Sequence, residues 1–223
     1  MAGFRIGVLI SGRGSNLQAL IDAAAEAAYP AEIALVVSNV PGAAGLDRAA
    51  AAGIPRQTID HRDYDDRAAF DAAVDAALRA AGVELVCLAG FMRLLGAAFV
   101  ERWPNRIINI HPSLLPAFKG LDVHEQVLAA GVRISGCTVH YVVPEVDAGP
   151  IVAQAAVPVV ADDTAATLAA RVLAAEHRIY PLAVRLIAEG RVLIGADGTV
   201  RIDGQDALAP ALLNPLDSAA VET

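Results

Sequence analysis

The chain has 223 residues, of which 56% are hydrophobic and 19% charged, and its formal net charge is −8 at pH 7. This composition excludes an intrinsically disordered chain, and an acidic balance without a Lys/Arg run argues against a nucleic-acid partner. Apolar stretches stop well short of the roughly 20 residues that a membrane span needs, so no membrane contact is expected. The first residues do not follow the pattern of a secretory signal, which indicates a cytoplasmic protein.

Short runs of β-branched residues alternate with alanine-rich stretches of helical period in the first 130 residues. This alternation is typical of βαβ units that build a parallel sheet covered by helices on both faces. The sequence predicts strands near residues 4–10, 32–38, 54–58, 83–89 and 106–110. It predicts helices near residues 15–27, 43–52, 65–81 and 122–130.

The pattern changes in the C-terminal half. Strands predicted at 134–143 and 151–158 are joined by a connection too short for a parallel crossover, so the sheet is expected to become mixed there. A long helix is predicted from about Thr164 to Ala188, and Pro181 is expected to kink it or to end its first half. A small hairpin follows at 191–203. The fold class is therefore α/β, a Rossmann-like, mostly parallel sheet with flanking helices and mixed strands in the C-terminal half.

The segment from Ser11 to Leu17 is a glycine-rich turn between the first strand and the first helix. Its free backbone N–H groups and the positive end of the helix dipole make it a natural anion site. It is not a dinucleotide fingerprint, because Leu17 stands where a third glycine is needed, and it lacks the Gly-Lys-Ser/Thr of a Walker loop. A tight turn with Ser15 as the helix N-cap would explain the same residues without a ligand.

A second segment contains Asn109 and His111, which the period of a strand places on one face. Pro112 is expected to end that strand and to leave His111 at its carboxyl end, where open α/β sheets bind ligands. An amide beside an imidazole can polarise a carbonyl and stabilise the oxyanion that forms when the carbonyl is attacked. A lone His that merely satisfies a local carbonyl is the alternative.

Three further features bear on chemistry. Asp147 lies in a turn-rich connection, where its carboxylate could set the tautomer of a nearby His and favour the charged imidazolium, although Asp is also an ordinary turn residue. For Glu176 in the long helix, a polar side chain on a solvated face is the alternative to a functional role. Cys87 and Cys137 have apolar strand-like surroundings and are expected to be buried thiols without a nucleophilic role.

Taken together, these segments resemble the folate-dependent formyltransferases. Four strings carry the likeness in order and spacing over residues 4 to about 203, namely 9–18, 88–95, 109–116 and 139–150. Asn-Ile-His-Pro-Ser-Leu-Leu-Pro with a later Asp-Ala-Gly-Pro is highly specific for this class. The loop Gly-Arg-Gly-Ser-Asn narrows the likeness to the branch that formylates glycinamide ribonucleotide, or to its hydrolytic relative.

Without an internal repeat or a Gly/Ser linker, the chain is interpreted as one domain over residues 1–204, which the resemblance identifies as a formyltransferase domain. The tail over 205–223 contains Pro210 and Pro215 and has no clear period, so it is expected to be surface-bound or loose. The domain would transfer the formyl group of 10-formyltetrahydrofolate to the amine of glycinamide ribonucleotide in purine biosynthesis. Catalysis falls to Asn109, His111 and Asp147, with no metal. The residues implied at the ribonucleotide are Gly12, Arg13, Gly14, Ser15, Asn16 and Glu176. Those implied at the formyl-folate are Arg67, Met92, Arg93, Leu94, Leu95, Asn109 and His140.

Two departures and three alternatives accompany this interpretation. Arg13 occupies a variable place in the loop, and Asp122 stands where the family often has a His. Formyltetrahydrofolate deformylase normally carries a further N-terminal domain, and methionyl-tRNA formyltransferase needs a basic surface and an RNA-binding domain. A nucleotide-binding module without catalysis would leave Asn109, His111 and Asp147 unexplained. The two small-molecule substrates are the expected partners, and the sequence leaves open whether the chain forms a homodimer.

Overall fold

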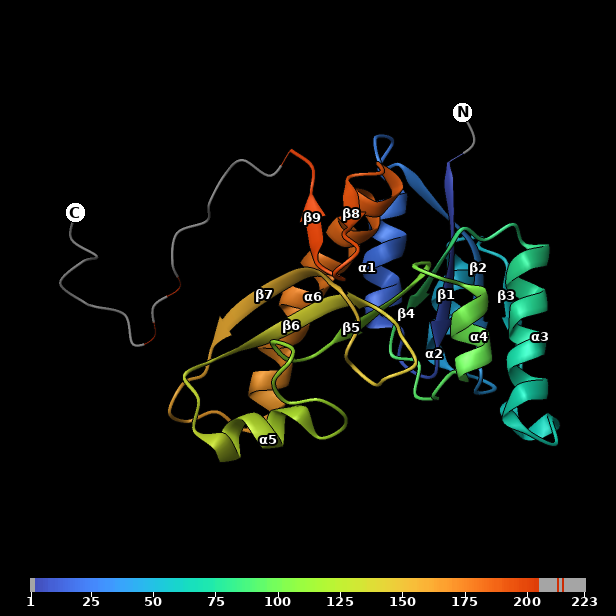
Figure 1. Cartoon of the computed structure of the whole chain (residues 1–223). Coiled ribbons are helices and arrows are strands. Elements are labelled where there is room, and N and C mark those ends of the chain that lie inside the picture. The colour runs from blue at the N-terminus through green and yellow to red at the C-terminus, as the bar shows by residue number, and fades with distance from the viewer. Residues whose placement is uncertain (1–2, 205–211, 213, 215–223) are drawn as a thin grey trace.

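The computed structural model describes residues 3–204, 212 and 214, and its centre is one seven-stranded sheet (Figure 1). The strands follow the order β3-β2-β1-β4-β5-β6-β7 across the sheet. Their bounds are Phe4–Ile10 for β1, Ala31–Ser38 for β2, Arg56–Thr58 for β3, Leu85–Leu88 for β4, Ile107–His111 for β5, Ile134–Tyr141 for β6 and Ile151–Pro158 for β7. All seven coincide with the strands predicted from the sequence, with ends that differ by a few residues.

The sheet has a parallel part and an antiparallel part. Strands β3, β2, β1, β4 and β5 run parallel, whereas β6 runs antiparallel to both β5 and β7. The mixed C-terminal half that the sequence predicts is therefore confirmed. The order of the strands reverses between β1 and β4, so the carboxyl ends of these two strands form the crevice where such sheets bind ligands.

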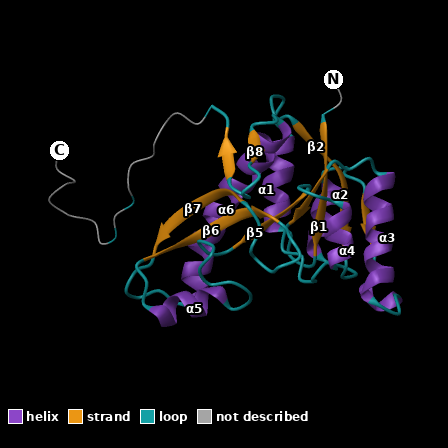
Figure 2. Ribbon diagram, in the orientation of Figure 1, coloured by secondary structure: helices purple, strands orange, loops and turns teal. Residues whose placement is uncertain are grey.

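Helices cover both faces of the sheet (Figure 2). One buried apolar cluster joins the sheet to α1, α2, α5 and α6, and a second joins the opposite face to α3 and α4. The helices span Ser15–Ala24 (α1), Ala44–Ala51 (α2), Arg67–Ala80 (α3), Ala97–Arg102 (α4), Val123–Ala130 (α5) and Ala165–Ala188 (α6), with a 3₁₀ turn at His61–Asp63. Helix α4 is not predicted from the sequence, because its six residues fall below the length at which a helical period can be recognised.

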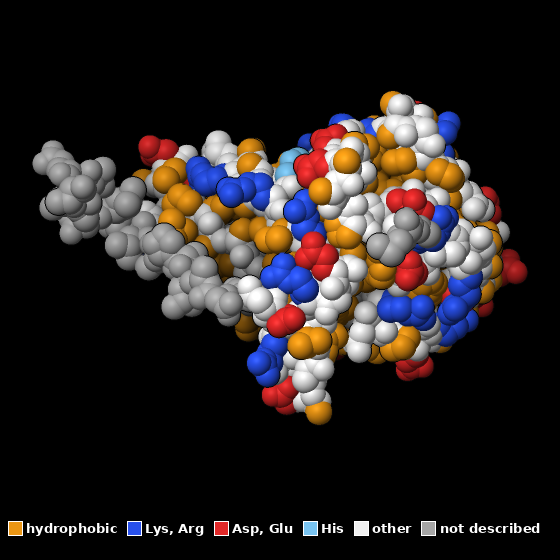
Figure 3. Space-filling model, turned by 90° about the horizontal axis from the view of Figure 1, so that it is seen from above, with side chains coloured by type: hydrophobic (Ala, Val, Ile, Leu, Met, Phe, Trp, Pro, Cys, Tyr) orange, Lys and Arg blue, Asp and Glu red, His pale blue; other side chains and the backbone are white. Residues whose placement is uncertain are grey.

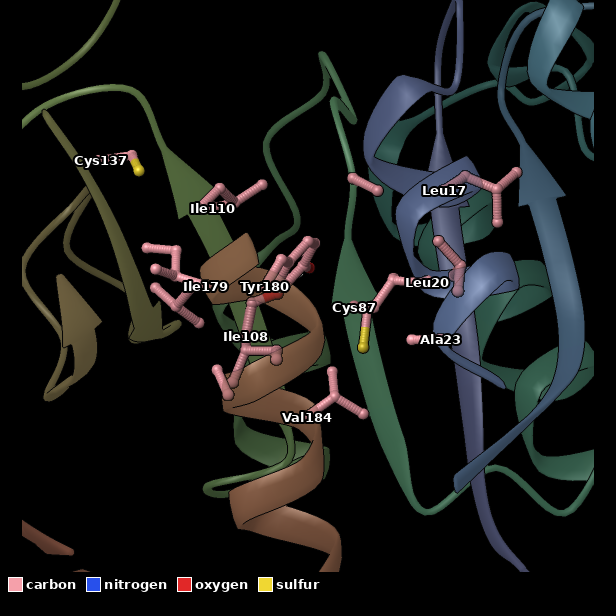
Figure 4. Packing of buried hydrophobic residues seen from close by; sticks show 14 of the residues in the cluster. Leu17, Leu20, Ala23, Cys87, Ile108, Ile110, Cys137, Ile179, Tyr180 and Val184 are labelled. Carbon is pink, nitrogen blue, oxygen red and sulfur yellow. Dashed lines mark hydrogen bonds between the residues drawn. The ribbon is translucent and has the colours of Figure 1, made fainter. Parts of the chain in front are cut away.

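The larger cluster lies where α1 and α6 meet the middle of the sheet (Figure 4). Leu20 of α1 and Val184 of α6 are fully buried there against Cys87 of β4 and Ile108 of β5. Each such aliphatic side chain stabilises the fold by about 1.5–3 kcal/mol. The Tyr180 hydroxyl donates a 2.9 Å hydrogen bond to the carbonyl of Leu88, which ties α6 to the end of β4.

Both thiols are free and buried, as the sequence predicts. Burial raises the pKa of Cys87 far above its ordinary value and that of Cys137 to about 12. Neither thiol therefore forms the thiolate that a nucleophile requires.

Helix α6 begins with a capping box, in which Thr164 and Thr167 exchange hydrogen bonds between side chain and backbone. The helix runs through Pro181 to Ala188, so the expectation that its first half ends there is wrong. A proline removes one backbone donor, but burial of Tyr180 and Val184 on either side of it supports the helix through that turn.

The predicted hairpin is present as β8 (Val192–Ile194) and β9 (Val200–Ile202), which pair in antiparallel register. The tail over 205–223 lies outside the described residues except for Leu212 and Asn214, and the interpretation of 1–204 as one domain stays a prediction. Among the described residues, no helix has the length and apolarity that a membrane span requires.

Candidate active site

The loops after β1 and β4 are bonded to each other at the crevice of the sheet. The backbone N–H of Ser11 donates to the carbonyl of Gly90 at 3.0 Å, and the Ser11 hydroxyl accepts from the N–H of Met92 at 2.7 Å. The same hydroxyl donates to the Asn39 side chain at 2.6 Å, which adds the end of β2. Ser11 thus fixes the position of the glycine loop relative to the segment that begins at Met92.

The glycine loop depends on one residue in the left-handed region. Gly14 has φ 69°, and a Cβ there would lie 2.6 Å from the Cα of Gly45 in α2. Gly45 in turn donates its N–H to the carbonyl of Gly12 at 3.0 Å, and Arg48 Nε donates to the carbonyl of Arg13 at 2.9 Å. Because the loop's carbonyls are bound to α2, its N–H groups and the first turn of α1 are left to face an anion.

Helix α1 begins at Ser15, and Gly14 is its N-cap without a side-chain hydrogen bond. The alternative in which Ser15 serves as the N-cap is therefore wrong. A left-handed glycine turns the chain into the helix here, so that Ser15 occupies the first helical position rather than the cap.

Asn16 and Glu176 form a buried pair between α1 and α6. The Asn16 Nδ2 donates a 2.7 Å hydrogen bond to Glu176 Oε2. Glu176 is 7% exposed, so the alternative in which it lies on a solvated face is wrong. Burial raises the pKa of Glu176 above its ordinary value, against the opposing effect of the hydrogen bond from Asn16. This bond uses one of the two hydrogens of the Asn16 amide, so a phosphate contact from Asn16 could come from the second hydrogen or from its backbone N–H.

The pairing of β5 with β6 brings a histidine next to the predicted catalytic asparagine. Asn109 is opposite His140 in this register, and the Asn109 Nδ2 lies 3.4 Å from His140 Nε2. His140 Nδ1 donates to the carbonyl of Tyr141 at 2.9 Å, which leaves Nε2 as the acceptor of the neutral ring. His140 therefore orients the Asn109 amide, and the second hydrogen of that amide remains available for a substrate oxygen.

Asp147 lies between the two histidines of the site. Its Oδ2 is 3.5 Å from His111 Nδ1, and its Oδ1 is 3.7 Å from His140 Nε2. The backbone N–H of Gly120 donates to Asp147 Oδ2 at 2.9 Å. His111 Nε2 donates to the carbonyl of Phe118 at 2.9 Å. The structure thus brings together Asn109, His111 and Asp147, which the sequence had singled out from two distant segments.

The two histidines have different surroundings. Burial lowers the pKa of His140, outweighing the Tyr141 carbonyl and the charge of Asp147, so His140 stays neutral at pH 7. Both ring nitrogens of His111 face oxygen acceptors, Phe118 on one side and Asp147 on the other. Each ring nitrogen of His111 therefore has an oxygen acceptor to which an N–H could donate.

The backbone around the cluster is unusual. Among the described residues that are not glycine, positive φ occurs at Phe118, Asp122 and Asp147 near the site and at Asn105 elsewhere. Such conformations cost about 1–3 kcal/mol each. They persist where the surrounding structure holds the backbone in place, and they are often found at functional sites. Phe118 and Gly120 contact the cluster and were missed from the sequence. The turn-rich stretch that follows the His-Pro motif was the signal that could have found them.

The residues expected at the formyl-folate border the loop that follows β4. Met92 and Leu94 are 73% and 62% exposed, which is high for large apolar side chains. Arg93 packs its guanidinium over the Phe70 ring at 5.2 Å, and a Cβ at Gly96 would lie 3.6 Å from Arg67 Nε. Open apolar surface beside two cations suits a flat ring that carries carboxylates. Among the described residues, no group of His, Cys, Asp and Glu is arranged to hold a metal.

Comparison with known proteins agrees with this geometry. The family model described as "Formyl transferase" matches residues 4–184. The chain is 44% identical over 198 residues to the phosphoribosylglycinamide formyltransferase of Escherichia coli, covering 89% of this chain and 93% of that protein. It is similar to the crystal structure of glycinamide ribonucleotide transformylase 1 from Symbiobacterium toebii, with a TM-score of 0.87, 54% identity and coverage of 90% of this chain and 94% of that one.

A longer relative is the human trifunctional purine biosynthetic protein adenosine-3, which is 53% identical over 196 residues. The match covers 88% of this chain and 19% of that protein. The chain therefore spans about a fifth of the length of this trifunctional relative.

Proposed function

The chain belongs to the formyl transferase family, and on that premise we propose that it transfers the formyl group of 10-formyltetrahydrofolate to the amine of glycinamide ribonucleotide. The observation that carries the proposal is the meeting of Asn109, His111 and Asp147 at the carboxyl end of β5. An amide donor, an imidazole satisfied in its charged form and a carboxylate beside it are the groups that acyl transfer through an oxyanion requires.

The reaction begins when the neutral amine of the ribonucleotide attacks the formyl carbon. A nitrogen–carbon bond forms, and the electrons of the carbonyl move to its oxygen. The free hydrogen of the Asn109 amide and the positive charge on His111 stabilise that oxyanion. The bond from carbon to N10 of the folate then breaks. The amine loses one proton and N10 gains one, so the transfer needs no net proton, and His111 with Asp147 is placed to relay it.

Asp147 has the supporting role in this mechanism. Its Oδ2 faces His111 at 3.5 Å, and the Gly120 N–H holds the same oxygen in place. His140 has its own donor turned to the Tyr141 carbonyl and stays neutral, so it does not compete for the charge of the carboxylate. The carboxylate therefore favours the imidazolium of His111 and orients its ring.

The binding residues divide between the two substrates. The ribonucleotide phosphate would lie at Gly12, Arg13, Gly14 and Ser15, where N–H groups and the α1 dipole converge, with Glu176 near the amine end. The pterin would lie at Met92 to Leu95, and Arg67 would meet the glutamate carboxylates. Positive charge at the two binding sites, from Arg13 and the α1 dipole at one and from Arg67 and Arg93 at the other, would explain how a chain of net charge −8 could accept two anionic substrates.

Other partners would need a surface that the chain does not offer on the face seen in Figure 3. There, Lys and Arg side chains are interspersed with Asp and Glu side chains over the described part of the surface. Binding of nucleic acid through its phosphates requires a basic stripe. Together with the net charge of −8 and the lack of a Lys/Arg run in the sequence, this mixed surface leads us to expect no nucleic-acid partner.

One assay tests the proposed function. Purified protein is given 10-formyltetrahydrofolate with and without glycinamide ribonucleotide, and formylated ribonucleotide and tetrahydrofolate are both measured. We expect both products in equal amounts, and only when the acceptor is present. Release of tetrahydrofolate at the same rate without the acceptor would indicate a hydrolase, and no turnover in either mixture would contradict the proposal.

A further inference from the structure

Helix α3 carries a buried carboxylate that the mechanism does not use. Asp71 is 3% exposed, and its Oδ2 accepts a 2.7 Å hydrogen bond from the backbone N–H of Gly96. Gly96 is the N-cap of α4 and directly follows Leu95. The bond therefore anchors the end of the segment Met92 to Leu95 onto the helix that begins with Arg67.

The position of the Asp71 carboxylate is unfavourable for the stability of the fold. Burial raises the pKa of Asp71, against the opposing effects of the Gly96 N–H and of the charges on Arg67, Arg93 and Arg102. Its second oxygen, Oδ1, has no hydrogen-bond partner among the described residues. A buried carboxylate that is only partly satisfied destabilises a fold, so packing alone does not account for it.

Asp75, one turn further along α3, is the structural counterpart. It accepts hydrogen bonds from Trp103 Nε1 at 2.7 Å and from Arg79 Nε at 2.9 Å, and Arg102 lies 3.6 Å away. These partners belong to α3, to α4 and to the residue that follows α4. Asp75 thus stabilises helix packing, whereas Asp71 contacts the loop.

We propose that Asp71 is a positioning residue, which holds the segment Met92 to Leu95 beside Arg67 so that one formyl-folate can contact both. The inference rests on the proposed function, because it assumes that this loop receives the folate. Two contacts hold the loop to α3, namely the Asp71 bond to Gly96 and the packing of Arg93 on Phe70. The Nε of Arg93 is buried without a partner in the described part of the chain, so its own hydrogen bonds do not secure the loop.

The test compares Asp71→Ala with Asp71→Asn and Asp75→Asn. Removal of a hydrogen bond to a charged group is expected to raise the KM for 10-formyltetrahydrofolate about 10-fold in Asp71→Ala, which corresponds to about 1.4 kcal/mol. The values of kcat and of the ribonucleotide KM should stay within about threefold of wild type, because the catalytic cluster is built on β5, on β6 and on the connection that follows β6. Asp71→Asn keeps an oxygen acceptor for Gly96 and should restore most of the folate KM.

Hydrogen exchange at the Gly96 amide gives a readout that is independent of activity. Exchange should accelerate in Asp71→Ala and remain near wild type in Asp75→Asn, although the latter should melt at a lower temperature. An unchanged folate KM in Asp71→Ala, an equal rise in both KM values, or the same folate defect in Asp75→Asn would overturn the proposal. Failure of the wild-type protein to transfer a formyl group would instead contradict the proposed function, and the exchange data would still report on the loop.

Discussion

The glycine loop and the catalytic cluster lie at the same edge of the sheet but are built in different ways. In the loop, backbone groups of Gly12 and Arg13 are bound to α2, and Gly14 approaches Gly45 more closely than any side chain would allow. In the cluster, side chains from β5, from β6 and from the connection between β6 and β7 meet around Asp147. The geometry of the glycine loop therefore depends on the backbone, whereas that of the catalytic cluster depends on charged and polar side chains.

This difference separates the two tasks of the proposed enzyme. A cradle of fixed N–H groups binds a phosphate equally well before and during reaction, so its loss is expected to raise KM. A carboxylate that supports an imidazolium matters most when the oxyanion develops, so its loss is expected to lower kcat. Variants in the two regions should therefore fail in different kinetic constants.

The largest effect is expected for Asp147→Asn. The amide keeps the shape of the side chain but removes the charge that favours the imidazolium of His111, so kcat should fall about 100-fold or more with little change in the ribonucleotide KM. Steady-state kinetics with both substrates measures this. Asp122→Asn is the matched control, because Asp122 also has positive φ and should keep near-normal kcat. A near-normal kcat in Asp147→Asn would reduce Asp147 to a turn residue.

The next effect is expected for Gly14→Ala. A Cβ there meets positive φ and the Cα of Gly45 at 2.6 Å, so the loop must move. We expect the free energy of unfolding to fall by about 2–3 kcal/mol, with a rise in the ribonucleotide KM that exceeds the rise for the folate. Denaturant unfolding and kinetics measure the two parts.

Gly53→Ala is the control for Gly14→Ala, because it introduces the same strain from positive φ without a close contact to a neighbouring backbone. Gly53 has a similar φ of 68°, but among the described residues no heavy atom lies within 4 Å of its Cβ position. We expect it to cost only about 1 kcal/mol and to leave both KM values unchanged. If the two glycine variants behaved alike, the contact with Gly45 would have no importance for the loop.

A smaller effect is expected when Ser15 and Asn16 are replaced together by Ala. Loss of their contacts should raise the ribonucleotide KM about 10-fold, while the folate KM changes little. The melting temperature should fall as well, because Glu176 loses the donor that satisfies it. Asp22→Ala is a control on the same helix, since Asp22 is exposed and its side chain bonds to Gln18. Equal changes in both KM values would place the phosphate elsewhere.

The glycine loop was more accessible to sequence analysis than the cluster, and the reason is physical. A loop of glycines before a helix leaves its mark in consecutive residues, whereas His140 reaches Asn109 only through an antiparallel register between strands. The resemblance had assigned His140 to the folate, and its contact with Asp147 became visible only in the structure. The partners Phe118 and Gly120 act through backbone groups, which any residue type could provide.

The strands and the mixed sheet were predictable, because chain connectivity limits the directions in which neighbouring strands can run. Burial was harder to predict. The sequence of the long helix allowed Glu176 to be solvated, because the helical period does not show which neighbour covers a given face. The hydrogen bond from Asn16 joins residues 160 positions apart. Of the two outcomes expected at Pro181, an end of the helix is wrong, since packing of α6 against the sheet outweighs the local preference.

Glu176 is an exception to this difference between the two regions. It is a buried titratable side chain, although it lies beside the glycine loop, where binding is expected to depend on backbone groups. Its pKa is raised in the folded state by burial, so folding favours the protonated form. The stability that this provides is present below the ordinary pKa of 4.5 and is lost as the pH rises through the higher folded value. At pH 7.5 the ionised carboxylate therefore destabilises the fold relative to a neutral side chain.

The smallest effect is accordingly expected for Glu176→Gln, and it is a gain in stability. Gln can still accept the hydrogen bond from Asn16 and does not titrate, so the melting temperature at pH 7.5 should exceed that of the wild type. The difference should shrink as the pH is lowered, because the raised pKa of Glu176 brings protonation of the wild-type carboxylate to a higher pH than in the unfolded chain. Thermal melts from pH 5 to pH 8 measure this, and Glu125→Gln on α5 is the control. The ribonucleotide KM should rise in the same variant, because the charge near the amine is gone. A stability difference that does not change with pH would contradict this prediction. It would show that ionisation of the Glu176 carboxylate does not destabilise the fold.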